Sequence, residues 1–131
     1  MQLEDQLISL KLSKRLKELG VKQQSLFYWE WASDECYGLA YFPYCVYPLN
    51  GSEFTHFSAF TSSELLEMLN WNVHFEGTWY ILNSYKRVLE NYVRYSNGVG
   101  GDLTVLYDTC DTNEANARAK MLIYLLENNF I

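Results

Sequence analysis

The central part of this sequence contains no lysine or arginine. Between Gln23 and Tyr85 every charged side chain is a carboxylate, and all ten basic residues lie outside this segment. The carboxylates are Glu30, Asp34, Glu35, Glu53, Glu64, Glu67 and Glu76. The whole chain has a formal net charge of -6, whereas affinity for a phosphate backbone comes mainly from lysine and arginine. We therefore expect neither DNA nor RNA as a partner.

Long apolar runs and paired cysteines are also missing. No apolar run approaches the roughly 18 residues that a membrane-spanning helix needs, and the opening residues, which include Glu4 and Asp5, lack the layout of a secretory signal. The three cysteines are odd in number and have no CxxC spacing, which argues against a disulfide framework and favours a reducing compartment. We therefore expect a cytoplasmic protein that does not contact a membrane.

Familiar catalytic and cofactor motifs are absent as well. The sequence has no GxSxG, HExxH, GxGxxG or P-loop string, and the glycines at 98–101 lack the Lys-Ser/Thr pair and the helix that phosphate binding requires. His56 and His74 do not lie at metal-ligand spacing from each other or from the cysteines. We expect no metal, no cofactor and no enzymatic activity, and keep a small enzyme of unknown reaction as the third hypothesis.

The length and the hydrophobic pattern predict one domain, residues 1–131, of the α+β class. A chain of 131 residues with 49% hydrophobic residues is typical of a single core. Apolar spacing and capping residues predict helices over 2–19, over 62–69 after a Thr61–Glu64 capping box, and from Asp111 or Thr112 onward. The predicted strands are 25–31, 36–47, 53–60, 71–75, 79–82 and 103–107.

These elements predict a mostly antiparallel sheet of about five to seven strands with N-terminal, short middle and C-terminal helices. Residues 85–95 fit both a helical stripe and a strand, and we favour a strand in their second half.

The segment without basic residues also holds all four tryptophans. In a strand pair only one face belongs to the core. We therefore expect some of these rings on an outer face, with carboxylates around them. Such a face suits a cationic partner or a homo-oligomer interface, in which tryptophan and tyrosine act as anchors. The alternative is that helices cover both faces. The candidate residues of this protein or oligomer face are Trp29, Trp31, Tyr41, Tyr44, Trp71 and Trp79.

A second hypothesis is a site for a small phosphorylated nucleotide. Outside the first helix, one compact group of basic residues lies among tyrosines, and arginines that bind a phosphate beside a ring that stacks on a base would suit this ligand. The alternative is a set of solvated charges. The candidate residues are Lys86, Arg87, Tyr92, Arg94 and Tyr95.

Three blocks of the sequence resemble a set of small proteins of unassigned function that bacteriophages and prophages carry. The blocks are LKELGVKQQSLFYW at 16–29, SAFTSSEL at 58–65 and EANARAKMLIYLLEN at 114–128. The resemblance implies a phage accessory protein in the cytoplasm of a bacterial host. Proteins of this kind frequently antagonise host defence, either by binding a defence protein or by sequestering a nucleotide signal, so we expect one of these two functions.

Overall fold

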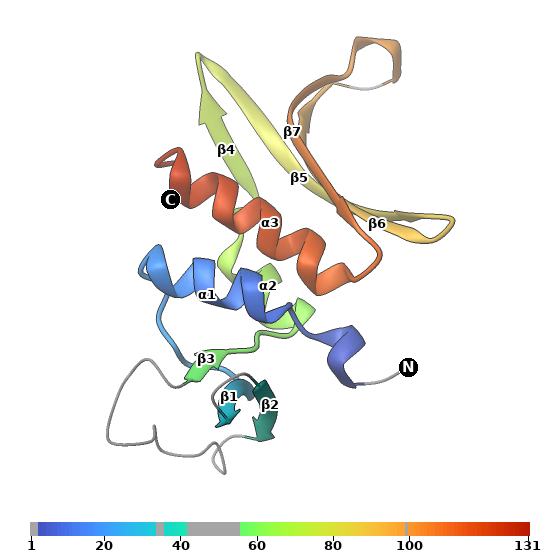
Figure 1. Ribbon diagram of the computed structural model, residues 1–131. Helices are drawn as coiled ribbons and strands as arrows, with labels where there is room; N and C mark the ends of the chain where they lie inside the picture. Colours follow the sequence, from blue (N-terminus) through green and yellow to red (C-terminus); the bar gives the residue numbers. More distant parts are fainter. Residues whose placement is uncertain (1–2, 34–35, 42–55, 99) are drawn as a thin grey trace.

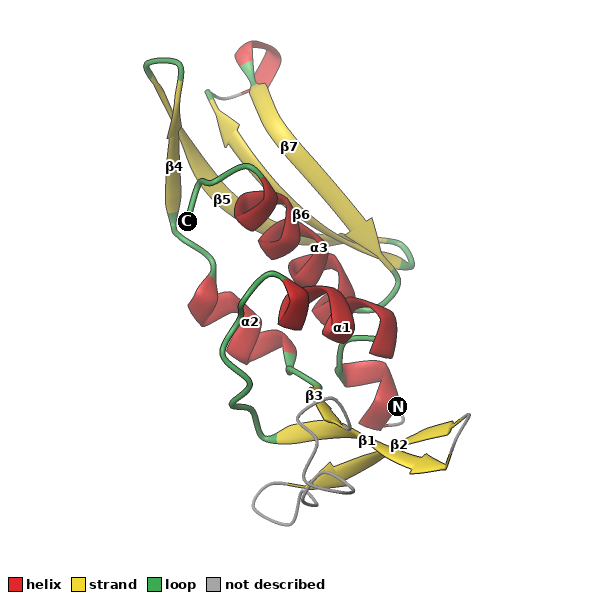
Figure 2. Ribbon diagram, turned by 60° about the vertical axis from the view of Figure 1, so that its left-hand side comes forward, coloured by secondary structure: helices red, strands yellow, loops and turns green. Residues whose placement is uncertain are grey.

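The computed structural model describes residues 3–33, 36–41, 56–98 and 100–131. Within these residues three α-helices lie between two antiparallel sheets, so that the chain forms three layers (Figures 1 and 2). Each sheet turns one face toward the helices, and apolar side chains on these inner faces and on the helices are removed from water together.

The larger sheet has four strands in the order β4-β5-β6-β7, all antiparallel to their neighbours. The strands are β4 (Asn72–Phe75), β5 (Thr78–Arg87), β6 (Glu90–Asn97) and β7 (Thr104–Asp111), and a short 3-10 helix, η4 (Gly100–Asp102), precedes β7. Residues 85–95, which fit either element in the sequence, belong to the hairpin of β5 and β6. A turn at Val88 and Leu89 joins these two strands.

The smaller sheet has three strands in the order β2-β1-β3. They are β1 (Phe27–Ser33), β2 (Cys36–Tyr41) and β3 (His56–Ser58). Residues 42–55, which include parts of two predicted strands, lie outside the described residues. The indole N–H of Trp29 donates to the carbonyl of Ile8 (3.0 Å) and so fastens β1 to the segment before the first α-helix.

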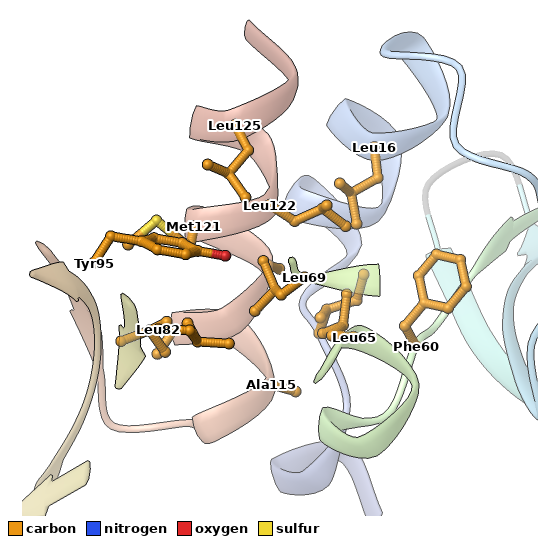
Figure 3. Packing of buried hydrophobic residues seen from close by; sticks show 14 of the residues in the cluster. Leu16, Phe60, Leu65, Leu69, Leu82, Tyr95, Ala115, Met121, Leu122 and Leu125 are labelled. Atoms are coloured by element: carbon orange, nitrogen blue, oxygen red, sulfur yellow. The ribbon is translucent and has the colours of Figure 1, made fainter. Parts of the chain in front are cut away.

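The helices are α1 (Leu10–Glu18), α2 (Ser62–Met68) and α3 (Glu114–Glu127), with a short 3-10 helix, η1 (Leu3–Gln6), near the start. Their buried side chains meet the inner face of the larger sheet in one core (Figure 3). Tyr95 of β6, Leu65 of α2 and Met121 of α3 are among its fully buried members. On β7 the Thr109 hydroxyl donates to the Ala117 carbonyl (2.8 Å), so α3 lies directly against this sheet.

The first predicted helix, over residues 2–19, is wrong in its middle. Leu7 forms an antiparallel bridge with Thr61, and the N–H of Ile8 donates to the carbonyl of Phe60 (3.1 Å), so this part of the chain is extended. Ser9 then caps α1 by accepting a hydrogen bond from the N–H of Leu12. The helix is therefore divided into η1 and α1 because its middle pairs with a distant segment.

The predicted α+β class is confirmed, with helices near the N-terminus, in the middle and near the C-terminus. The strands form two sheets, whereas the sequence predicts one. The capping box is also confirmed, since Thr61 accepts from the N–H of Glu64 and the Glu64 carboxylate accepts from the N–H of Thr61. The last helix begins slightly later than predicted. Its N-cap is Asn113, which accepts from the N–H of Asn116.

Candidate binding face

One face of the larger sheet is left uncovered by the helices. α3 packs on the inner face, where Leu82, Val93 and Tyr95 are buried, and the opposite face, called the outer face below, points away from the helical layer (Figures 1 and 2). Successive strand residues point to opposite faces and cross-strand partners share a face. The register therefore assigns to the outer face Asn72, His74, Trp79, Ile81, Asn83, Tyr85, Arg87, Glu90, Tyr92, Arg94, Ser96, Val105, Asp108 and Cys110.

The end of the outer face near the β4–β5 turn is apolar. Trp79 is 57% exposed and Ile81 is 58% exposed, and Val105 of β7 is 41% exposed. The rings of Trp79 and His74, which are cross-strand partners, lie with their centroids 4.8 Å apart. Three large apolar side chains thus face solvent from two strands of one sheet.

The other end carries tyrosines and an arginine cluster. Tyr85 and Tyr92 are cross-strand partners whose rings stack, with centroids 5.2 Å apart and planes 7° from parallel. The guanidinium carbons of Arg94 and Arg87 lie 5.2 Å and 5.7 Å from the centroid of the Tyr85 ring, a cation–π arrangement. The Tyr92 hydroxyl donates to Glu90 (3.1 Å), and this hydrogen bond raises the pKa of Tyr92 above its ordinary value.

An ion pair lies between these two ends. Arg94 of β6 and Asp108 of β7 face each other in the register, and Arg94 Nη2 lies 3.0 Å from Asp108 Oδ2. Cys110 lies beside Tyr92 on the same face. Desolvation and the nearby Glu90 carboxylate raise the pKa of the Cys110 thiol above its ordinary value, which disfavours the thiolate.

The five residues of the predicted nucleotide site do not assemble as a group. Arg87, Tyr92 and Arg94 converge on the outer face together with Tyr85, which adjoins the basic group in the sequence but is not one of the five predicted residues. Tyr95 lies in the core with no exposed surface, and its hydroxyl donates to the carbonyl of Asn70. Lys86 pairs with Asn91 on the opposite side from Arg87, where it lines a hollow of about 450 Å³.

The aromatic residues of the predicted protein face are divided among several places. Trp71 is 72% exposed and lines, together with Trp79, a hollow of about 560 Å³ beside His74 and Phe130. Trp29 is half-buried between the smaller sheet and the chain before α1. Trp31 and Tyr41 belong to β1 and β2, and Tyr44 lies outside the described residues.

The sequence did not single out Ile81, Val105 and Tyr85 as exposed members of the same face. The alternation of residues 78–87 indicates Ile81 and Tyr85, because Leu82 lies on the buried face of the strand and Trp79, Ile81 and Tyr85 lie on the opposite face. Val105 lies on β7, outside this stretch. The predicted strand ends at Leu82, five residues before the end of β5 at Arg87, and so does not include Tyr85.

Neither a metal centre nor a membrane span is found in the part of the chain that the structure describes. No group of three or more His, Cys, Asp or Glu side chains there could hold a metal ion. None of the described helices has the length and apolar character that crossing a bilayer takes. In comparisons with known proteins, no family model, curated protein or solved structure matches this chain.

Proposed function

We propose that this chain is a non-enzymatic binding protein that contacts another protein through the outer face of its larger sheet. The observation that carries the proposal is the exposure of Trp79 and Ile81, at 57% and 58%, on a sheet face that no described helix covers. When one face of an antiparallel sheet lies in water, its side chains are ordinarily polar. An exposed face of large apolar and aromatic side chains is instead typical of an interaction surface.

The chemistry of the outer face favours a protein over a small molecule. Tryptophan, tyrosine and arginine are enriched at the energetic centres of protein interfaces, where polar groups form the rim. On this face Trp79, Tyr92 and Arg94 are distributed over the open surface of the sheet. The charge of Arg94 is already paired with Asp108 at 3.0 Å, so it is less available to a small anion than a solvated arginine.

The cellular role in this proposal is that of a phage or prophage accessory protein that antagonises a host defence factor. This part rests on the resemblance of the three sequence blocks to phage-borne proteins, and on the preference for protein binding argued above. The partner is then a host protein, and a second copy of the chain is the other protein partner that the face could take.

Site-specific photo-crosslinking tests the proposed interface. A photo-crosslinking phenylalanine derivative replaces either Ile81 on the outer face or Leu26, which has nearly the same exposure, 57% against 58%, but lies outside the larger sheet. In cells of the bacterial host we expect a defined adduct from position 81 and none from position 26, and mass spectrometry identifies the captured protein. Trp79→Ala should lower the yield of the adduct.

The mass of the adduct separates the two protein partners. An adduct of twice 15.4 kDa would identify a second copy of this chain, and any other defined mass a host protein. If position 81 gives no adduct beyond that from position 26, the proposed interface is wrong.

The second candidate function is sequestration of a phosphorylated nucleotide signal. The cluster of Arg87, Arg94, Tyr85 and Tyr92 favours it, because two guanidinium groups lie within 6 Å of one tyrosine ring. Thermal-shift measurements against cyclic and ADP-ribose-type nucleotides test this function, because a ligand that binds the folded state raises the melting temperature. A shift that Arg87→Ala and Arg94→Ala both remove would favour it, and the absence of any shift would contradict it.

A further inference from the structure

A groove runs along the free edge of the larger sheet, separate from the apolar end of the outer face. Its walls come from α1, α3 and β7, and its volume is about 870 Å³. The lining residues are Leu10, Lys11, Leu12, Lys14, Arg15 and Glu18 of α1, Tyr107, Asp108, Thr109 and Cys110 of β7, and Lys120 and Ile123 of α3.

The backbone of β7 is available for pairing along this groove. Among the described strands β7 pairs with β6 alone, so its other edge is open. An antiparallel strand turns the N–H and C=O groups of every second residue toward the same side. The Cys110 carbonyl accepts from Lys120 Nζ of α3 (3.0 Å), which shows that Cys110, and by alternation Asp108, turn their backbone groups away from β6.

The groove combines an apolar lining with positive charge. Leu10, Leu12, Tyr107 and Ile123 supply its apolar surface. Tyr107 is held there by stacking on Tyr124 of α3, with ring centroids 3.7 Å apart. Of its six charged lining residues four are cations, on a chain whose net charge is -6. Two of these cations are already in ion pairs, Arg15 with Glu18 and Glu127 and Lys120 with Asp111. The positive charge of Lys11 and Lys14 on α1 therefore favours an acidic segment over a basic one at this groove.

From these features we infer that the groove binds an extended, acidic segment of a partner protein, which adds to the larger sheet as a fifth strand beside β7. The added strand pairs with the outward backbone groups of Asp108 and with the N–H of Cys110, whose carbonyl already accepts from Lys120. The apolar lining accepts alternate side chains of the segment. Lys11 and Lys14 favour acidic sequences by electrostatic complementarity. A second copy of the chain fits less well, because its own Lys11, Lys14 and Arg15 would meet the same cations.

An NMR titration tests this inference with a defined probe. The ¹⁵N-labelled protein is titrated with a capped eight-residue peptide in which glutamate and valine alternate. Because a one-residue shift of register exchanges the two faces of a strand, this peptide can present either its valines or its glutamates to the groove. We expect saturable shifts of the amide signals of residues 107–111 and 10–15. A peptide of alternating lysine and valine should cause none, and N-methylation of all the amides of the acidic peptide should abolish binding.

A pair of matched variants tests the charge of the groove. Lys11 is exposed near the start of α1, where a carboxylate also suits the helix dipole, so Lys11→Glu should fold normally. Since it replaces an attraction by a repulsion, it should weaken binding of the acidic peptide about fivefold or more. The control is Lys22→Glu, which makes the same charge change at an exposed lysine outside the groove and should leave the affinity unchanged.

Several outcomes would overturn the inference. They are an absence of shifts at millimolar peptide, shifts centred on Trp79, Ile81 and Tyr85, equal binding of the lysine peptide, or equal weakening by both variants. A molecular mass that grows with protein concentration in the absence of peptide, and that Lys11→Glu alters, would assign this edge to a second copy. The crosslinks from position 81 do not depend on any of these results, so the failure of one proposal is distinguishable from the failure of the other.

Discussion

The hydroxyl of Tyr95, in the middle of β6, donates a hydrogen bond to the backbone carbonyl of Asn70, which follows α2. The ring itself has no exposed surface and lies in the core against the helical layer (Figure 3). Burial raises the pKa of Tyr95 far above its ordinary value, so the hydroxyl is protonated and acts as a donor at neutral pH. This tyrosine joins the larger sheet to the chain between α2 and β4.

Tyr95→Phe should therefore reduce stability without changing the outer face. The variant leaves the Asn70 carbonyl without this donor, which should cost about 1–3 kcal/mol of unfolding free energy, measured by urea denaturation. Tyr92→Phe is the control, because it removes a hydroxyl of a half-buried tyrosine on the same strand that bonds only the Glu90 side chain, and it should change stability by less than about 0.5 kcal/mol. Equal losses in both variants would contradict a structural role for the Tyr95 hydroxyl.

The capping box at the start of α2 gives a second prediction. Thr61→Ala removes the acceptor for the N–H of Glu64 and should lower stability by about 1 kcal/mol. Glu64→Ala should cost at least as much, because the same carboxylate also accepts from the N–H of Leu26 (3.2 Å), just before β1. Ser63→Ala, at an exposed position of the same turn, should have little effect. If Ser63→Ala lowered stability as much as Thr61→Ala does, loss of the cap would not explain the effect of Thr61→Ala.

Sequence patterns predicted those features that depend on neighbouring residues. Thr61 and Glu64 are three residues apart, and the cap they form needs nothing else. Similarly, Gly20 adopts a φ of +88° just beyond α1, a backbone conformation that glycine favours at the end of a helix. The interruption of the first helix could not be predicted in this way, because it depends on the pairing of Leu7 with Thr61, which is remote in the chain.

The candidate site was partly predicted for a related reason. Arg87, Tyr92 and Arg94 share a face, whereas Lys86 and Tyr95 point to the other face, although all five are close in sequence. Alternation separates the two groups only when residues 85–95 are assigned to strands. Nothing in the local composition indicates the hairpin, since its turn is Val88-Leu89 and contains neither glycine nor asparagine.

That turn supplies a third prediction. Val88 has a φ of +49°, in the left-handed region, where a β-branched side chain is strained, and it is 91% exposed. Val88→Gly removes the strain but also increases the conformational entropy of the unfolded chain. The net result should be an unfolding free energy that is higher by up to about 1 kcal/mol. Leu89→Gly, at the neighbouring position without a positive φ, should instead lower stability. Urea denaturation of both variants measures the difference, and a loss in Val88→Gly would show that the turn is not strained.

The last prediction concerns the pH dependence of stability at the junction of β7 and α3. The Asp111 carboxylate accepts from the N–H of Asn113 (2.9 Å) and lies 2.9 Å from Lys120 Nζ. Burial opposes ionisation of Asp111, but these two contacts outweigh it and hold its pKa below the ordinary value of 3.8. A carboxyl group whose pKa is lower in the folded protein stabilises it above the pKa of the unfolded chain, and this stability is lost as pH falls through the folded value.

Stability should therefore fall as the pH is lowered from about 5 toward 2, and Asp111 should account for part of the decline. In Asp111→Asn the difference in unfolding free energy from the parent protein should be greatest above pH 5 and should shrink toward pH 2. Lys120→Gln removes the cation that faces Asp111. The unfolding free energy of this variant should also depend less on pH, because the N–H of Asn113 alone lowers the pKa of Asp111 less than the two contacts together. Urea denaturation at a series of pH values measures both effects. A difference between Asp111→Asn and the parent protein that is constant with pH would mean that the carboxylate is not held ionised by these contacts.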